Sequence, residues 1–178
     1  MKYIALLRGI NIGRNKRIKM ADLVKTLESL GFKNVKTYLQ SGNVIFEHDS
    51  SDIAEIAESI ERKISETFSF SVDVIIRTND ELERVVKGNP FIKELDIELD
   101  KLYVTFLSDI PDPKAVLNMD IDKAENEKFE IIGREVYLYC PNGYARTKLK
   151  NDAFERKLNT TATTRNWKTT NKLMELSG

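Results

Sequence analysis

The sequence predicts a mixed α/β fold of two ferredoxin-like lobes of the βαββαβ type, with mainly antiparallel sheets packed against helices. Three observations carry this prediction. Apolar residues alternate in short runs typical of strands, and they recur at helical spacing between those runs. The segment order β-α-β-β-α-β over residues 1–77 begins again after residue 100. The first strand is apolar on both faces, so a second layer is needed to cover it.

Residues 1–77 form the first predicted lobe. The strand from Lys2 to Ile10 leads into a polar loop with four cations that ends at Lys19. Gly31 is a helix stop signal, and Asp52 is a predicted N-cap for a second helix. The other predicted elements are a helix from Met20 to Leu30, a hairpin of strands Val35–Leu39 and Asn43–Glu47 with a Gln40-Ser41-Gly42 turn, a helix from Ile53 to Ile64, and a strand from Val72 to Ile76.

Residues 78–100 form a predicted helical connector, and residues 101–178 form a second, degenerate lobe within one compact unit. Thr78 and Glu81 have the spacing of a capping box, and Gly88 follows the short helix that they begin. We expect a C-terminal helix, from about Asn166 to Leu176, to stand in place of a fourth strand. The preceding elements are a strand at Lys101–Leu107, a short helix at Pro111–Asn118, a hairpin of Phe129–Ile132 and Val136–Cys140, a helix at Thr147–Leu158, and a β-branched polar run at Thr160–Thr164.

Composition excludes several classes of protein. The 178 residues include 28 Lys plus Arg and 28 Asp plus Glu, and this zero net charge argues against a protein that coats nucleic acid non-specifically. No apolar stretch is long enough to cross a membrane, and the N-terminal apolar run is too short for a signal peptide. A single cysteine cannot form an internal disulfide, so we expect a cytoplasmic protein without a membrane partner.

Charge is unevenly distributed along the chain. Residues 1–40 carry a net charge of +7, residues 41–143 a net charge of −12, and residues 144–178 a net charge of +5. Two interpretations follow: the oppositely charged segments lie against each other and cancel, or the two basic ends converge in one positive surface.

The predicted topology brings two polar turns together. In a ferredoxin-like lobe, the loop after the first strand and the hairpin between the second and third strands share one edge of the sheet. The first helix also begins there, and its free backbone N–H groups favour an anion. Arg165 and Asn166 stand at the start of the last helix, the equivalent edge of the second lobe. The predicted ligand-binding residues are Arg8, Gly9, Asn11, Lys16, Arg17, Gln40, Ser41, Gly42, Asn43, Arg165 and Asn166.

Each of these motifs also has a purely structural interpretation. Asn11 and Asn43 are residue types that bond turn backbone, and Ser41 lacks a nearby base because His48, the only histidine, is predicted to lie away from the hairpin edge. Arg165 is an exposed side chain in this interpretation, and Cys140 is a small core or boundary residue. The last helix is anchored by Trp167 and capped by Thr164 or Asn166, and the acidic residues Asp120, Asp122, Glu125 and Glu127 form a solvated turn.

Four motifs resemble those of the bacterial domain-of-unknown-function 1697 family: Leu6 to Gly13, Thr37 to Phe46, Asn89-Pro90-Phe91, and Thr164 to Trp167. The resemblance runs essentially end to end, and it implies a compact cytoplasmic α/β protein with ferredoxin-like repeats. It implies no activity, ligand or catalytic residue. Family members are expected to have a second glycine after Gly13, where this chain has Arg14.

The sequence therefore favours binding of an anionic ligand, a nucleotide or a nucleic-acid phosphate, at the edge formed by the loop after the first strand and the hairpin. The alternative is a protein-interaction module that binds a partner or forms a homo-oligomer, without catalysis. No acid–base pair, metal-ligand set or cofactor motif stands out. Whether the protein is an enzyme stays open at this point.

Overall fold

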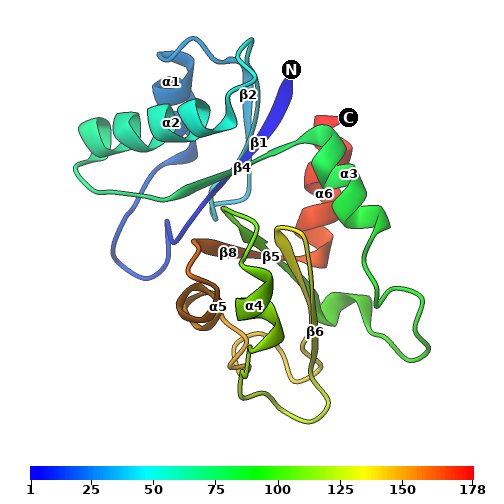
Figure 1. The fold of residues 1–178 in the computed structure, drawn as a ribbon. Coiled ribbons are helices and arrows are strands. Elements are labelled where there is room, and N and C mark those ends of the chain that lie inside the picture. Colours follow the sequence, from blue (N-terminus) through cyan, green and yellow to red (C-terminus); the bar gives the residue numbers. More distant parts are fainter. The chain divides into compact units, whose positions relative to one another are not determined.

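A computed structural model describes residues 1–178, which form two compact units. Unit 1 consists of Met1–Glu83 with Leu173–Gly178, and unit 2 consists of Arg84–Lys172. Each unit contains a four-stranded antiparallel sheet (Figure 1). The mixed α/β fold predicted from the sequence is therefore confirmed. The units divide inside helix α3 (Asn79–Lys87), after the end of the first predicted lobe at residue 77.

In unit 1, two helices pack on one face of a sheet with strand order β2-β3-β1-β4. Alternate residues of β1, among them Tyr3, Ala5 and Leu7, join the core formed with both helices, as period-2 geometry requires. Leu23 contributes from α1 and Ile60 from α2. The elements are β1 (Lys2–Leu7), α1 (Met20–Glu28), β2 (Lys33–Tyr38), β3 (Asn43–Glu47), α2 (Ile53–Phe68) and β4 (Val74–Thr78).

Unit 2 repeats this topology, with strand order β6-β7-β5-β8. Phe154 and Leu158 of α5 (Asn151–Leu158) pack against Leu107, Val136 and Leu138 of the sheet in a second core. The elements are a 3-10 turn (Leu99–Lys101), β5 (Leu102–Leu107), α4 (Pro113–Leu117), β6 (Lys128–Ile132), β7 (Glu135–Tyr139), α5 (Asn151–Leu158), β8 (Ala162–Asn166) and α6 (Trp167–Ser177), whose last residues belong to unit 1.

The strand β8 corrects one expectation, because the C-terminal helix was predicted to replace it. β8 pairs with β5 along its whole length, and α6 follows directly after it. The strand lacks the apolar alternation that indicates strands, because threonines interrupt it. Thr164 makes a hydrogen bond of 2.7 Å to Thr105 on β5, which gives its hydroxyl a partner inside the sheet.

The repetition extends to single hydrogen bonds. The N–H of Leu7 donates to Gly42 in the hairpin of unit 1, and the N–H of Leu107 donates to Arg134 in the hairpin of unit 2, both at 2.8 Å. A buried arginine precedes the last residue of the fourth strand in each unit, Arg77 opposite Ile4 and Arg165 opposite Val104. This is the arrangement expected of an internally duplicated chain.

Helix starts follow the predicted capping chemistry. The Oδ1 atom of Asp52 accepts a hydrogen bond of 3.0 Å from the N–H of Glu55 at the start of α2. Thr78 and Glu81 form a reciprocal capping box at α3, with bonds of 2.9 and 3.2 Å. Each bond gives a partner to a backbone donor that the helix itself leaves unpaired.

Candidate functional site

The loop between β1 and α1 is closed at its base by Asn11. The backbone N–H of Asn11 donates to the carbonyl of Lys16 at 3.0 Å. Its side-chain amide donates to the carbonyl of Ile18 at 3.0 Å and accepts from the N–H of Ile18 at 2.9 Å. Asn11 has a φ of 55°, a left-handed conformation that asparagine tolerates better than most residues. One side chain therefore fixes the shape of this loop.

The loop lies beside the turn of the β2–β3 hairpin, as the topology predicts. Asn11 Nδ2 also donates to the carbonyl of Gln40 at 2.8 Å. Gly42 has a φ of 80°, and a Cβ atom there would lie 2.7 Å from Cβ of Leu7 and 2.8 Å from Cδ1 of Ile10. The close approach of hairpin and loop thus requires glycine at this position.

Asn43 is part of the hairpin's own structure. Its side chain is buried, and Nδ2 donates to the carbonyl of Tyr38 at 2.8 Å and to Oγ of Ser41 at 3.0 Å. These hydrogen bonds of Asn11 and Asn43 form the turns, in agreement with the structural interpretation of these two residues. Gln40 and Ser41 stay exposed at the same edge.

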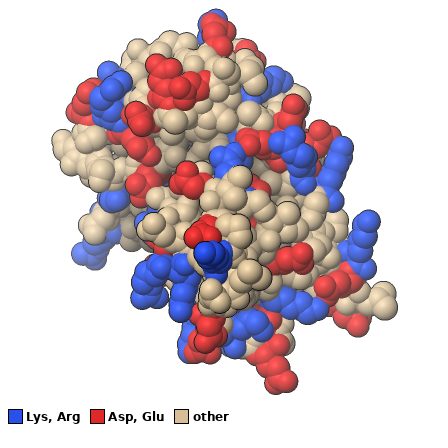
Figure 2. Space-filling view, viewed as in Figure 1, with Lys and Arg blue, Asp and Glu red and all other residues tan.

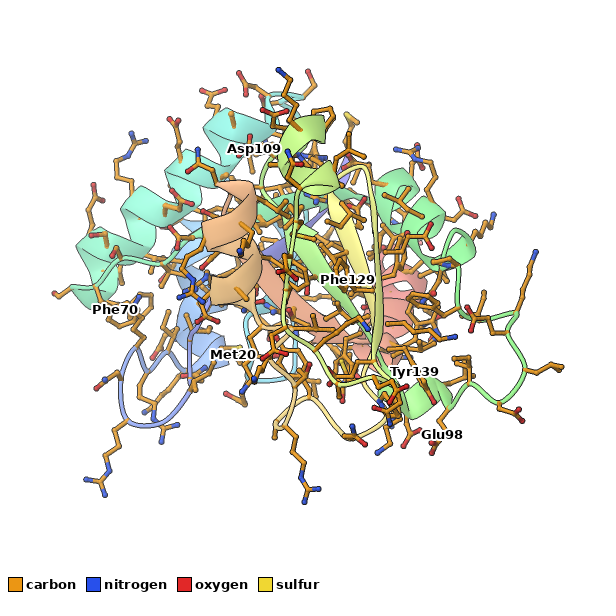
Figure 3. The ribbon with its side chains drawn as sticks, turned by 60° about the horizontal axis from the view of Figure 1, so that its bottom comes forward. Met20, Phe70, Glu98, Asp109, Phe129 and Tyr139 are labelled. Carbon is orange, nitrogen blue, oxygen red and sulfur yellow. The ribbon has the colours of Figure 1, made fainter.

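Four exposed cations follow Asn11, and we call this set the basic loop: Arg14, Lys16, Arg17 and Lys19. None of them forms an ion pair within the chain. Side chains of the loop that leads to Met20 extend away from the ribbon (Figure 3). Lys19 is the N-cap of α1 and makes no side-chain capping bond, so the first turn of the helix lacks the usual side-chain acceptor.

Arg8 and Gly9 connect β1 to this loop. The N–H of Arg8 donates to the carbonyl of Asp73 at 2.9 Å, so the segment before β4 also borders the site. Gly9 has a φ of 71°, which lets the chain turn sharply after the strand. Arg8 is half-buried, whereas the carboxylate-bearing Asp73 is exposed.

Arg165 and Asn166 lie in unit 2 and have other surroundings. The Arg165 guanidinium is buried, not exposed, and Nη1 donates to Oγ1 of Thr163 at 2.8 Å and to the carbonyl of Thr164 at 2.9 Å. Burial lowers the pKa of Arg165 to about 10. Asn166 caps α6 by accepting from the N–H of Thr169 at 2.7 Å, and Trp167 is buried beside it. Asn166 and Trp167 therefore follow the structural interpretation of the motif, whereas the buried Arg165 contradicts it.

Cys140 and His48 are the residue types most often used as nucleophile and base, but their surroundings do not activate them for catalysis. Cys140 is fully buried, and burial raises the pKa of its thiol to about 11, so it is protonated at neutral pH. His48 accepts a hydrogen bond of 3.1 Å from the N–H of Ser50 and packs edge-on against Phe32. Neither residue forms a nucleophile–base pair with the other or with Ser41.

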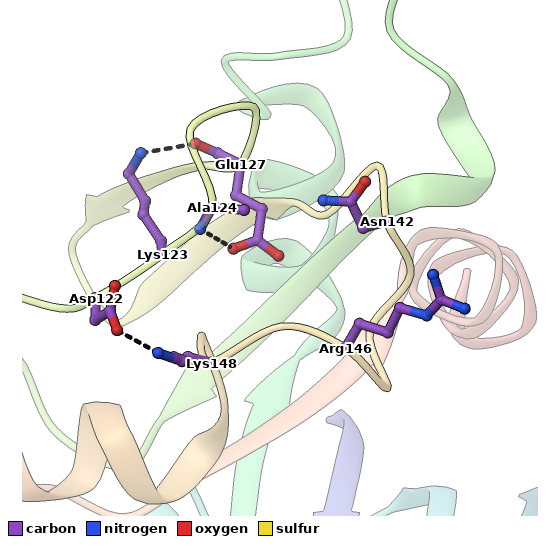
Figure 4. Close-up of a pocket in the computed structure, with 7 residues that line it drawn as sticks. All are labelled: Asp122, Lys123, Ala124, Glu127, Asn142, Arg146 and Lys148. Atoms are coloured by element: carbon purple, nitrogen blue, oxygen red, sulfur yellow. Dashed lines mark hydrogen bonds and ion pairs between the residues drawn. The ribbon is translucent and has the colours of Figure 1, made fainter.

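A pocket of about 430 Å³ lies wholly within unit 2 (Figure 4). Glu127 is buried in it, which corrects the expectation that the acidic residues from Asp120 to Glu127 form a solvated turn. Its Oε2 atom accepts from the N–H of Ala124 at 3.0 Å. The lining residues are Asp122, Lys123, Ala124, Glu127, Asn142, Arg146 and Lys148.

Sequence analysis missed this pocket, although the predicted hairpin contained a signal for it. β6 and β7 are antiparallel neighbours, with Lys128 opposite Tyr139, so the residues before β6 must lie beside those after β7. The side chains of Asn126 and Asn142 exchange hydrogen bonds of 3.0 and 3.3 Å between these two segments. The missing information was burial, which sequence spacing does not supply.

Charge and hydropathy bear on three further kinds of feature: a broad charged surface, a metal site and a membrane-spanning helix. On the face shown in Figure 2, acidic and basic side chains are interspersed and do not form one broad field of a single sign. No cluster of three or more His, Cys, Asp or Glu residues is arranged to hold a metal ion. None of the helices has the length and apolar character needed to cross a bilayer.

The duplicated βαββαβ topology defines an α/β protein of two ferredoxin-like halves. The first half carries the basic loop. Residues 1–137 match the profile of the family described as a protein of unknown function, DUF1697, and the chain belongs to that family. It is also similar to a structure titled "The structure of conserved bacterial protein SP0830 from Streptococcus pneumoniae", with a TM-score of 0.75 and 22% identity over 99% of this chain and 98% of the other. At that identity the likeness concerns the fold. No curated protein matches the chain.

Proposed function

We propose that this protein binds an anionic ligand, a nucleotide or nucleic-acid phosphate, at the basic loop and the adjacent hairpin turn. The supporting observation is a set of four exposed cations without ion-pair partners on a loop whose base is closed by Asn11. The exposed side chains of Gln40 and Ser41 add hydrogen-bonding groups beside them.

The basic loop concentrates positive charge in a short segment. Four cations within six consecutive residues, from Arg14 to Lys19, repel one another, and no carboxylate pairs with them. A phosphate bound among them relieves that repulsion and releases the counterions around both partners. The first turn of α1 begins at Met20 and contributes partial positive charge at the same place.

The open form of the site favours a phosphate backbone over base recognition. Two of the three amide side chains at the site, those of Asn11 and Asn43, already bond to turn atoms. Apart from Gln40 and Ser41, the exposed groups are flexible cations, which position a backbone but do not read sequence. We therefore expect binding that depends strongly on salt and weakly on base identity.

Fluorescence anisotropy with a labelled short single-stranded oligonucleotide, at a series of salt concentrations, tests the proposal. The triple variant Arg14→Ala/Lys16→Ala/Arg17→Ala should bind more weakly, and the slope of log K against log salt should become shallower by about 2, since each lost phosphate contact removes about 0.7. Circular dichroism should show an unchanged fold, because none of these side chains makes a hydrogen bond or ion pair in the chain.

The control removes the same charge elsewhere. Arg62→Ala/Arg156→Ala/Lys157→Ala takes away three exposed cations from α2 and α5. This variant should retain the parent slope. An equal loss in both variants would mean that net charge alone attracts the oligonucleotide, and absence of binding by the parent protein at low salt would end the proposal.

A further inference from the structure

Glu127 is a buried carboxylate with incomplete hydrogen bonding. It is 2% exposed, Oε2 accepts from the N–H of Ala124 at 3.0 Å, and its other oxygen has no partner within the chain. Burying a carboxylate is costly unless its lone pairs are matched by donors. The free oxygen points into the pocket in Figure 4.

The charged groups around Glu127 are mostly satisfied within the protein. Lys148 pairs with Asp122, and Lys123 Nζ donates to the backbone carbonyl of Glu127 at 2.9 Å. The Arg146 guanidinium is the exception, since it makes no hydrogen bond or ion pair. It lines the same pocket as Glu127 but does not pair with it.

The pocket thus presents two unmatched groups of opposite sign that do not meet each other. A purely cationic ligand would face Lys123, Arg146 and Lys148, and a purely anionic ligand would face the Glu127 carboxylate. A molecule with one positive and one negative group can pair with both Glu127 and Arg146. The volume of about 430 Å³ lies within the range of small-molecule sites. Asn142, which lines the pocket, is held by its hydrogen bonds with Asn126.

We propose that this pocket binds a small zwitterion, with its ammonium on Glu127 and its carboxylate on Arg146, the chemistry of a free amino acid. The ammonium supplies a donor to the unpaired oxygen of Glu127, and the guanidinium bonds the carboxylate. This site belongs to unit 2 and does not depend on the basic loop of unit 1.

Isothermal titration calorimetry with glycine, β-alanine, γ-aminobutyrate and ε-aminocaproate tests the proposal and measures the spacing between the two charges. One member of the series should bind best. Butylamine and butyrate, which carry one charge each, should bind at least about tenfold more weakly than that member, because each loses one charged hydrogen bond. Equal binding by either of these two would overturn the proposal, as would absence of heat with all four zwitterions.

Two variants test which pocket residue binds the ammonium of the ligand and which binds its carboxylate. Glu127→Gln keeps the acceptor for Ala124 and should weaken the best zwitterion about tenfold or more while leaving butyrate unaffected or improved. Arg146→Met should weaken the zwitterion while leaving butylamine unaffected. The controls Glu125→Gln and Arg156→Met change exposed residues outside the lining and should bind like the parent. Unchanged zwitterion binding by both pocket variants would show that the ligand lies elsewhere.

Discussion

Replacing Gly42 by alanine tests the close approach of the hairpin turn to β1, on which the proposed phosphate site depends. Two costs add. The φ of 80° is left-handed, which costs a residue with a Cβ about 1–2 kcal/mol. The new Cβ would also lie 2.7 Å from Cβ of Leu7 and 2.8 and 2.9 Å from two carbons of Ile10, an overpacking that costs about 1–3 kcal/mol. We expect Gly42→Ala to lower the free energy of unfolding by about 2–5 kcal/mol.

Gly31→Ala separates the two costs. Gly31 has a φ of 83°, almost the same as Gly42, but no atom lies within 4 Å of its added Cβ. This variant should lose only the backbone cost of about 1–2 kcal/mol. Urea unfolding followed by far-ultraviolet circular dichroism measures both variants. If Gly42→Ala is no less stable than Gly31→Ala, the hairpin does not press against Leu7 and Ile10 as described.

Two further predictions concern the cap of α2 and the buried thiol. Asp52→Ala should lower the free energy of unfolding by about 1 kcal/mol, since the N–H of Glu55 loses its acceptor; urea unfolding measures this, and Ser51→Ala should have little effect. Native Cys140 should react slowly with a thiol reagent at pH 8 and quickly in urea. The folded thiol keeps its proton to about pH 11, whereas the unfolded thiol releases it near 9.0, so stability should fall between these values, and less steeply in Cys140→Ala.

The internal duplication shows why a topology does not by itself specify a site. After β1, the N–H of Arg8 bonds to the carbonyl of Asp73, and after β5 the N–H of Ser108 bonds to that of Thr161, both at 2.9 Å. The backbone frame is thus the same at both edges. The side chains differ, because the first edge is followed by the basic loop and the second by Asp109. The proposed phosphate site therefore follows from side chains added to one copy of a repeated frame.

Local chemistry explains what could be predicted from the sequence. Apolar periodicity indicated β1, α1 and α2, and the capping pairs Asp52 with Glu55 and Thr78 with Glu81 marked helix starts, since these signals act over three or four residues. The order of elements then predicted that Asn11 and Gln40 lie at one edge, and their hydrogen bond confirms this contact. Antiparallel pairing of β1 with β3 brings the end of β1 beside the start of β3, next to the hairpin turn.

Burial was decided only by the tertiary structure. Glu127 and Arg165 belong to polar stretches that resemble solvated surface in the sequence, yet both side chains are buried. The strand β8 was likewise hidden, because Thr164 bonds to Thr105 only when β5 lies beside it. Sequence alone determined the order of the elements in residues 1–77 and the position of the basic loop in the chain. Which charges are enclosed depends on segments that are distant in the chain, since desolvation is a property of all the atoms around a group.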